Sequence, residues 1–192
     1  MSEAHFIEPM PCLAVKTLPE GEAWEYELKL EGYRALAVKH DGRVMLFSRN
    51  RKRLTSRFPD IAAAFARLPD YTIVDGEIVA MDESGRPSIN RLQNFSANDG
   101  AITFYAFDMP MWTGEDLRKQ PLDNRRDSSL SAEAFRSLAD ALIKRDCVKL
   151  NLAYVPPPWQ NCGGHLVRSL ADYRMSWQKW RWISFPRRTC RL

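Results

Sequence analysis

The 192-residue chain lacks any apolar run close to the ~20 residues that a membrane-spanning helix needs, so no membrane contact is expected. Its first residues, MSEAHFIEPMPCLAV, carry acids before the first lysine and have no long apolar core, unlike a secretory signal. Cysteine is scarce, and the four present have no metal-ligand spacing. We therefore expect reduced thiols in a cytoplasmic protein. The cysteines are Cys12, Cys147, Cys162 and Cys190.

The charge of the chain changes sign along its length. Residues 1–127 hold 17 Lys and Arg against 20 Asp and Glu, and the remaining residues hold 11 against 4. The second part is therefore basic, which fits a nucleic-acid partner and equally fits a disordered or poorly folded end. Regular structure is broken at Pro156-Pro157-Pro158, and no clear periodicity follows. We predict one domain over residues 1–145 and a divergent basic tail over 146–192.

Local patterns predict an α+β fold with largely antiparallel sheets. The pair Asp41-Gly42 favours a tight hairpin, because Gly adopts positive φ at little cost. Helices are predicted over 59–68, opened by Pro59, and over 131–144, capped by Ser131. Alternation predicts a strand over 24–30, and strand-like runs predict further strands over 35–39, 43–48, 71–81 and 102–109.

The first of these strands carries a lysine in its polar row. Apolar side chains fall on its even positions, whereas Glu25, Glu27 and Lys29 fall on the odd ones. Strand pattern alone favours a solvated face with a cross-strand ion pair. However, Lys29 also begins the stretch Lys29-Leu30-Glu31-Gly32-Tyr33-Arg34, of the form K-x-[DE]-G-x-R. That form is expected by chance in about one in a few hundred chains of this size, so its interpretation depends on the other motifs in the sequence.

Five motifs follow one another in order along the chain, and together they are specific. Through them, roughly residues 5–127 resemble the adenylation (nucleotidyltransferase) domain of ATP-dependent DNA ligases, especially the bacterial end-joining kind. The resemblance implies an ATP-grasp-like domain with antiparallel sheets flanked by helices, here truncated within 1–145. The motifs are Glu27-x-Lys29-x-Glu31-Gly32-x-Arg34, Ser48-Arg49-Asn50 with Phe58-Pro59, Val74-Asp75-Gly76-Glu77-Ile78-Val79, Phe104-Tyr105-Ala106-Phe107-Asp108, and Pro121-Leu122 with Arg125-Arg126.

The resemblance implies that Lys29 attacks the α-phosphorus of ATP, forms a lysyl-AMP and expels pyrophosphate. An amine attacks only when it is deprotonated, and nearby cations such as Arg34 and Mg²⁺ favour that state. The same cations stabilise charge that develops on the phosphates. The cofactors implied are ATP and Mg²⁺, with Glu31 and Glu77 as the metal ligands.

The remaining roles also come from the resemblance. It implies that Glu27 accepts a hydrogen bond from the adenine amino group and that Phe107 stacks on the adenine ring. Arg34 and Glu77 would hold the ribose. Arg49 would approach the ribose and phosphates or a DNA 5′-phosphate. Taken singly, Phe107 is better explained as core, and Glu77 is equally well explained as a solvated acid at a strand end.

The sequence departs from the family in two places. Glu31 stands where the family has Asp, and the longer side chain would displace the carboxylate in the turn. The family also needs a late E-G strand and a K-x-K pair, but the only glutamate after Asp127 is Glu133, in the predicted helix. Lys179 and Arg181 are the candidates for the basic pair. A frameshift, a truncation or true divergence would each produce this pattern, and the chain has no room for the oligonucleotide-binding-fold domain that usually follows.

Three functions therefore remain open. The first is a ligase that transfers AMP to the 5′-phosphate of nicked or broken duplex DNA during repair and recombination, with impaired activity. The second is an inactive remnant that binds ATP or DNA. The third is an RNA ligase or capping-type nucleotidyltransferase, although the F-P element and the V-D-G-E-I-V strand favour DNA ligase. No particular repair-protein partner is indicated.

Overall fold

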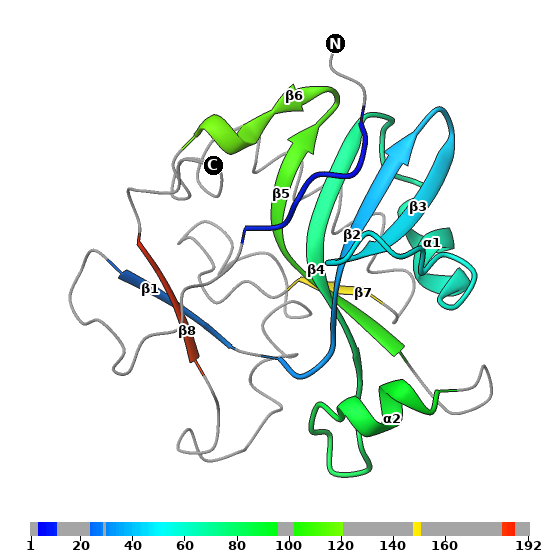
Figure 1. The fold of residues 1–192 in the computed structure, drawn as a ribbon, viewed down its shortest axis with the longest axis vertical. Helices are drawn as coiled ribbons and strands as arrows, with labels where there is room; N and C mark the ends of the chain where they lie inside the picture. Colours follow the sequence, from blue (N-terminus) through cyan, green and yellow to red (C-terminus); the bar gives the residue numbers. More distant parts are fainter. Residues whose placement is uncertain are drawn as a thin grey trace, which may run out of the picture.

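The fold is taken from a computed structural model that describes residues 4–10, 24–28, 30–95, 102–120, 148–150 and 182–186, with only the backbone considered for 24–28, 148–150 and 182–186 (Figure 1). The elements are β1 (Trp24–Leu28), β2 (Tyr33–His40), β3 (Arg43–Ser48), α1 (Pro59–Phe65), β4 (Thr72–Ala80), α2 (Ile89–Gln93), β5 (Ile102–Trp112), β6 (Glu115–Asp116), a 3-10 helix η1 (Leu117–Lys119), β7 (Val148–Leu150) and β8 (Trp182–Pro186).

The strands form two sheets. The larger sheet has the order β3-β2-β4-β5-β6, and β7 pairs with β5 in parallel. The smaller is the antiparallel pair β1–β8, which lies to the β5 side of the larger sheet in Figure 1. All other described pairs are antiparallel, so the α+β prediction with largely antiparallel sheets is confirmed.

The hairpin between β2 and β3 is the one that the sequence predicts. Asp41 and Gly42 have φ values of 46° and 72°, so both central residues adopt the left-handed conformation of a two-residue hairpin turn. The backbone N–H of Gly42 donates to Asp70 Oδ1 at 2.9 Å, which ties the turn to the segment before β4. The predicted Asp-Gly turn therefore also sets where β4 begins.

The two faces of the larger sheet are covered differently. On one face, α1 and the loop after it pack Ile61, Phe65 and Leu68 against β2, β4 and β5, as the helical pattern predicts, although the helix itself ends at Phe65. On the other face, the N-terminal segment, residues 4–10, places Ala4 and Ile7 on a smaller apolar cluster. Figure 1 shows this segment in dark blue running across the strands. The other buried members of the smaller cluster are Leu36, Val38, Ile73 and Met111.

The structure extends and corrects the predicted elements. β5 continues past Met109 through Pro110 to Trp112, because the register with β4 is irregular there and such irregularities tolerate proline. The sequence reading missed α2, β6 and η1, which are too short to show a period. The predicted helix over 131–144 lies outside the described residues. No helix in the described part of the chain is long and apolar enough to cross a membrane.

Two described strands lie in the predicted basic tail. β7 pairs with β5 and β8 pairs with β1, so backbone from both sides of the predicted boundary shares the same sheets. The boundary between 145 and 146 remains a prediction.

Candidate active site

Two motif glycines allow strands to approach closely. A Cβ on Gly32 would collide with the carbonyl oxygen of Ile78 and lie 2.9 Å from Glu77 Cγ. A Cβ on Gly76 would collide with the Phe104 ring and the Tyr105 carbonyl oxygen. The turn before β2 therefore packs directly on β4, and β4 packs directly on β5. The glycines of the K-x-[DE]-G and D-G-E motifs are needed for this packing, rather than for a positive φ.

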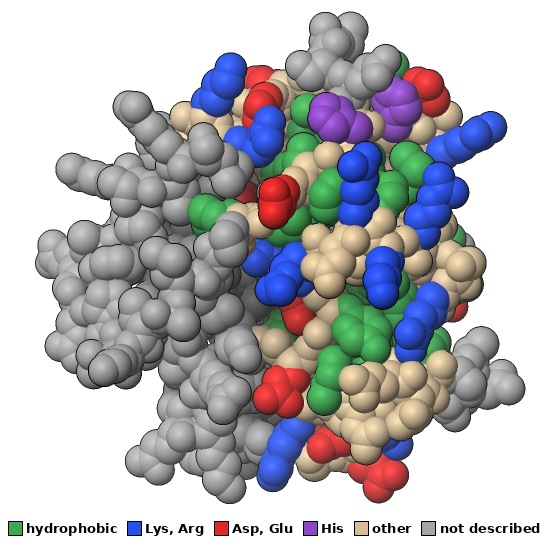
Figure 2. All heavy atoms as spheres, in the orientation of Figure 1, with side chains coloured by type: hydrophobic (Ala, Val, Ile, Leu, Met, Phe, Trp, Pro, Cys, Tyr) green, Lys and Arg blue, Asp and Glu red, His purple; other side chains and the backbone are tan. Residues whose placement is uncertain are grey.

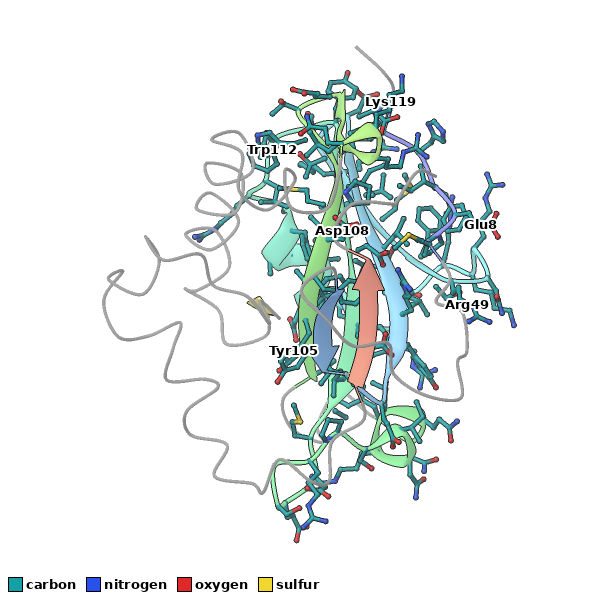
Figure 3. All side chains as sticks on the ribbon, turned by 90° about the vertical axis from the view of Figure 1, so that its left-hand side faces the viewer. Glu8, Arg49, Tyr105, Asp108, Trp112 and Lys119 are labelled. Atoms are coloured by element: carbon teal, nitrogen blue, oxygen red, sulfur yellow. The ribbon has the colours of Figure 1, made fainter. Side chains whose placement is uncertain are left out.

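Strand register gathers polar side chains on one face of the sheet. Arg34 on β2 is directly opposite Glu77 on β4, and Glu77 is opposite Tyr105 on β5. One step along, Asp75 is opposite Asp108. Directly opposed residues point to the same face, so these five side chains share it. Figure 3 labels Tyr105 and Asp108 along β5.

Arg34 contacts several groups around the site. Its Nε donates to Asp75 Oδ1 at 3.1 Å and its Nη2 to Asp75 Oδ2 at 2.6 Å, a bidentate pair. Its Nη1 donates to the backbone carbonyl of Met10 at 3.0 Å. Its Cζ lies 5.1 Å from the centre of the Phe107 ring. The guanidinium is thus oriented by contacts on β4, on β5 and on the N-terminal segment.

Asp75 is a buried carboxyl with opposing influences on its pKa. It is 3% exposed, and burial raises its pKa from 3.8 to about 6, a rise to which the neighbouring Asp108 adds. The hydrogen bonds and charge of Arg34 act in the opposite direction. Near neutral pH the carboxylate form therefore predominates and holds the guanidinium.

Phe107 reaches Arg34 because of an irregularity in β5. The register passes from the Asp75–Asp108 pair to the Gly76–Ala106 pair, which leaves one additional residue, Phe107, on β5. Such an irregularity turns a side chain out of the regular alternation. The ring is half-buried, and Arg34 covers one side of it. This position suits a ring that stacks on a planar group as well as on a guanidinium.

Arg49 follows β3 and lies on a basic surface. Its side chain is exposed, and its backbone N–H donates to the Arg34 carbonyl at 3.2 Å. Figure 2 shows Lys and Arg side chains gathered over β2, β3 and the loop after β3. Figure 3 places Arg49 on the same side of the molecule as Glu8. The exposed basic residues of this surface are Arg43, Arg49, Arg51, Lys52, Arg53 and Arg57.

The other predicted site residues are described less fully. Lys29 and Lys179 lie outside the described residues. Glu27 lies in β1, and its backbone is paired with Ile183 in β8. Glu31 is exposed in the turn before β2. The structure therefore brings together Arg34, Glu77 and Phe107, with Arg49 joined through the backbone.

The expected Mg²⁺ needs oxygen ligands near the site. The described residues contain no group of three or more His, Cys, Asp or Glu that could hold a metal ion. Mg²⁺ in phosphate-binding sites is held by one or two carboxylates together with phosphate oxygens and waters. Gly32 packs against the Glu77 side chain, so the backbone beside Glu31 lies close to Glu77, and these two carboxylates are the candidates for that shared kind of site.

Sequence reasoning missed three contributors. It assigned no role to Asp75, to Asp108 or to the carbonyl of Met10. Asp75 did carry a signal, because it is the one acid within the otherwise apolar run Ile73–Gly76, and a buried acid needs a partner. The Met10 carbonyl carries none, because every residue has one.

The known proteins that match this chain agree with one another. Residues 10–137 match the family described as the ATP dependent DNA ligase domain. The multifunctional non-homologous end joining protein LigD of Pseudomonas aeruginosa is 43% identical over 124 residues, which are 63% of this chain and 15% of that protein. The SPbeta prophage-derived DNA ligase-like protein LigB of Bacillus subtilis is 28% identical over 124 residues, 63% of this chain and 45% of that protein.

Solved structures agree. The ligase domain of LigD from M. tuberculosis matches with a TM-score of 0.61 and 27% identity, covering 87% of this chain and 50% of that chain. A mycobacterial DNA ligase D complexed with ATP and MES matches equally well, with 49% of that chain covered. The chain thus spans about half the length of these solved structures, and less than half the length of the curated relatives. Because the family match covers more than half of its residues, and because the fold and motif positions agree with it, the chain belongs to the ATP-dependent DNA ligase domain family, with relatives of the LigD kind.

Proposed function

We propose that this protein transfers AMP from ATP to Lys29 and then to the 5′-phosphate of a break in duplex DNA, as a step in nick sealing. Lys29 is the nucleophile: its nitrogen forms a bond to the α-phosphorus, and pyrophosphate leaves. A DNA 5′-phosphate then displaces the lysine and accepts AMP. Attack by a 3′-hydroxyl on the adenylated end releases AMP and closes the strand.

The observation that carries the proposal is the in-register pair of Arg34 and Glu77, with Phe107 against the same guanidinium. A nucleoside needs an aromatic face for its base and paired donors and acceptors for its ribose hydroxyls, and these three side chains supply them. That mycobacterial DNA ligase D has been observed with ATP gives independent support. Glu27 would contact the adenine amino group and thereby select ATP over GTP.

The basic surface would take the DNA. Arg49 would contact the 5′-phosphate, and the basic residues of the loop after it would contact neighbouring phosphates. Such contacts are electrostatic, so affinity for duplex DNA should fall steeply with salt. A Mg²⁺ ion held by Glu31 and Glu77 together with phosphate oxygens would supply neutralisation of phosphate charge when bound. Arg34, held by Asp75, contributes a permanent positive charge without any metal.

The test of the first step is covalent labelling. The full chain is incubated with α-labelled ATP and Mg²⁺, and the labelled peptide is identified by mass spectrometry. We expect AMP on Lys29, complete loss of label in Lys29→Ala, and retained label in Lys52→Ala, which removes an exposed lysine of the basic surface. AMP on another lysine would contradict the assignment. An unlabelled wild-type protein that still binds ATP would favour the inactive remnant, and labelling by GTP would favour a capping-type enzyme.

The later steps need a separate assay. A 5′-labelled nicked duplex is incubated with the protein, ATP and Mg²⁺, in parallel with nicked RNA and with a pre-adenylated nick. We expect transfer of AMP to nicked DNA but slow multiple-turnover sealing, because the family's late metal-binding glutamate has no match in the sequence. Loss of one such charge stabiliser typically costs ~10²–10³ in rate. Preference for the RNA substrate would overturn the DNA ligase assignment.

A further inference from the structure

We infer that the N-terminal segment, residues 4–10, is a positioning element that holds Arg34 in its working orientation through the backbone carbonyl of Met10. The inference rests on the proposed function in one respect only, which is that Arg34 contacts the nucleotide. The contact between the Met10 carbonyl and Arg34 does not depend on that function.

The segment is anchored on the sheet by its apolar side chains. Ala4 and Ile7 are 3% and 8% exposed, and they pack on the smaller apolar cluster that β2, β4 and β5 share. The ring of Phe6 packs edge-on against Phe47 of β3, with 5.7 Å between ring centres, and Arg51 Cζ lies 5.5 Å from the centre of the Phe6 ring. The segment therefore crosses the sheet as a bound strap rather than as a free end.

The strap ends at the site. From the buried Ile7 and Pro9 the chain continues to Met10, whose carbonyl accepts a hydrogen bond from Arg34 Nη1 at 3.0 Å. Asp75 takes Nε and Nη2, so its bidentate grip sets one edge of the guanidinium. The Met10 carbonyl binds Nη1, which Asp75 does not reach. Two acceptors from different parts of the chain therefore define the plane of the guanidinium, with Phe107 against its face.

Such pre-organisation has a consequence for binding. A guanidinium that is already ordered needs to lose little side-chain freedom when a nucleotide arrives, and its donors already point in fixed directions. The apolar side chains that hold the strap, Ala4 and Ile7, pack on the same face of the sheet as Arg34 but at a distance from it. Docking of the strap and orientation of Arg34 are therefore coupled, and undocking should affect nucleotide binding without removing any group that touches the nucleotide.

The test undocks the strap with Ile7→Asp, which places a charge in the apolar cluster. The matched control is Glu8→Ala, because Glu8 is the next residue, is exposed and points away from the sheet in Figure 3. The first readout is the NMR signal of the Arg34 Nη1 protons, which donate to the Met10 carbonyl, assigned through its loss in Arg34→Lys. We expect a protected, well-dispersed signal in the wild type and in Glu8→Ala, and a fast-exchanging, averaged signal in Ile7→Asp.

The second readout is a double-mutant cycle on self-adenylation. We expect Ile7→Asp to raise the KM for ATP about tenfold, the size expected for losing one hydrogen bond to a charged group, with a smaller effect on the maximal rate. In an Arg34→Lys background the same change should have little further effect, because a lysine cannot make the forked contacts. Additive effects in the two backgrounds would overturn the inference, as would an unchanged signal of the Arg34 Nη1 protons in Ile7→Asp.

Global unfolding is checked by amide exchange in β2 and β4. If Ile7→Asp unfolds those strands, Phe6→Ala replaces it, since this milder change removes the ring contacts to Phe47 and Arg51 and places no charge in the apolar cluster. The same outcomes then apply. If the wild-type protein takes no label from ATP, the proposed function fails, yet the Arg34 signal still decides whether the strap positions the side chain.

Discussion

The buried carboxyl of Asp75 makes a quantitative prediction about stability and pH. Burial raises its pKa from 3.8 to about 6 in the folded protein, while the unfolded chain keeps the ordinary value. The folded state therefore binds this proton more tightly than the unfolded state. Its contribution to stability is fully present below pH 3.8 and is lost as pH rises through about 6. A rise of this size corresponds to roughly 3 kcal/mol.

Urea unfolding of the wild type and of Asp75→Asn measures this contribution. Other titrating groups are common to both proteins, so the difference between their unfolding free energies isolates residue 75. We expect the wild type to lose roughly 3 kcal/mol relative to the variant between about pH 4 and about pH 7.5. A difference that stays constant, or that moves in favour of the wild type as pH rises, would refute the reasoning. It would mean that the pairing with Arg34 outweighs burial. The carboxyl carbon resonance of Asp75 gives an independent pKa.

Three further outcomes are expected. Gly76→Ala should destabilise the protein by about 1–3 kcal/mol in urea unfolding, because its Cβ would collide with β5, and a neutral result would contradict the close approach of the strands. Asp70→Ala should cost about 1–3 kcal/mol, because the Lys39 ammonium group, 3.7 Å away in a side chain only 9% exposed, loses its partner and the Gly42 N–H loses its acceptor. A loss no larger than the experimental error would contradict both contributions. Glu31→Asp should increase the rate of lysine labelling by restoring the family's shorter carboxylate, and an equal or lower rate would show that residue 31 is not limiting.

Much of the sheet could be predicted from local signals. Alternation identified β1, a strand-like run closed by turn residues identified β4, and the Asp41-Gly42 pair identified the hairpin, since all three depend on neighbours close in sequence. Pro59 and the spacing of apolar residues after it identified α1. The very short elements α2 and η1 escaped because one or two turns contain too few residues to show a period.

The candidate site was predictable only in part. Its residue types were evident from the motifs, because a nucleotide site needs charged groups and an aromatic ring at recurring positions. Their mutual contacts were not. The approach of Phe107 to Arg34 depends on an irregularity in the pairing of β4 with β5, and no pattern along β5 alone indicates it.

The sequence by itself determined which family this chain belongs to, where most strands of its larger sheet begin, and which side chains could meet a nucleotide. Only the tertiary structure decided what holds Arg34. Among the described residues, two groups that accept hydrogen bonds from it come from β4 and from the N-terminal segment, 41 and 24 residues away along the chain. One of them, the Met10 carbonyl, is a backbone atom that every residue type would supply. Backbone acceptors leave no mark in the amino-acid sequence, so their role appears only when folding brings distant segments together.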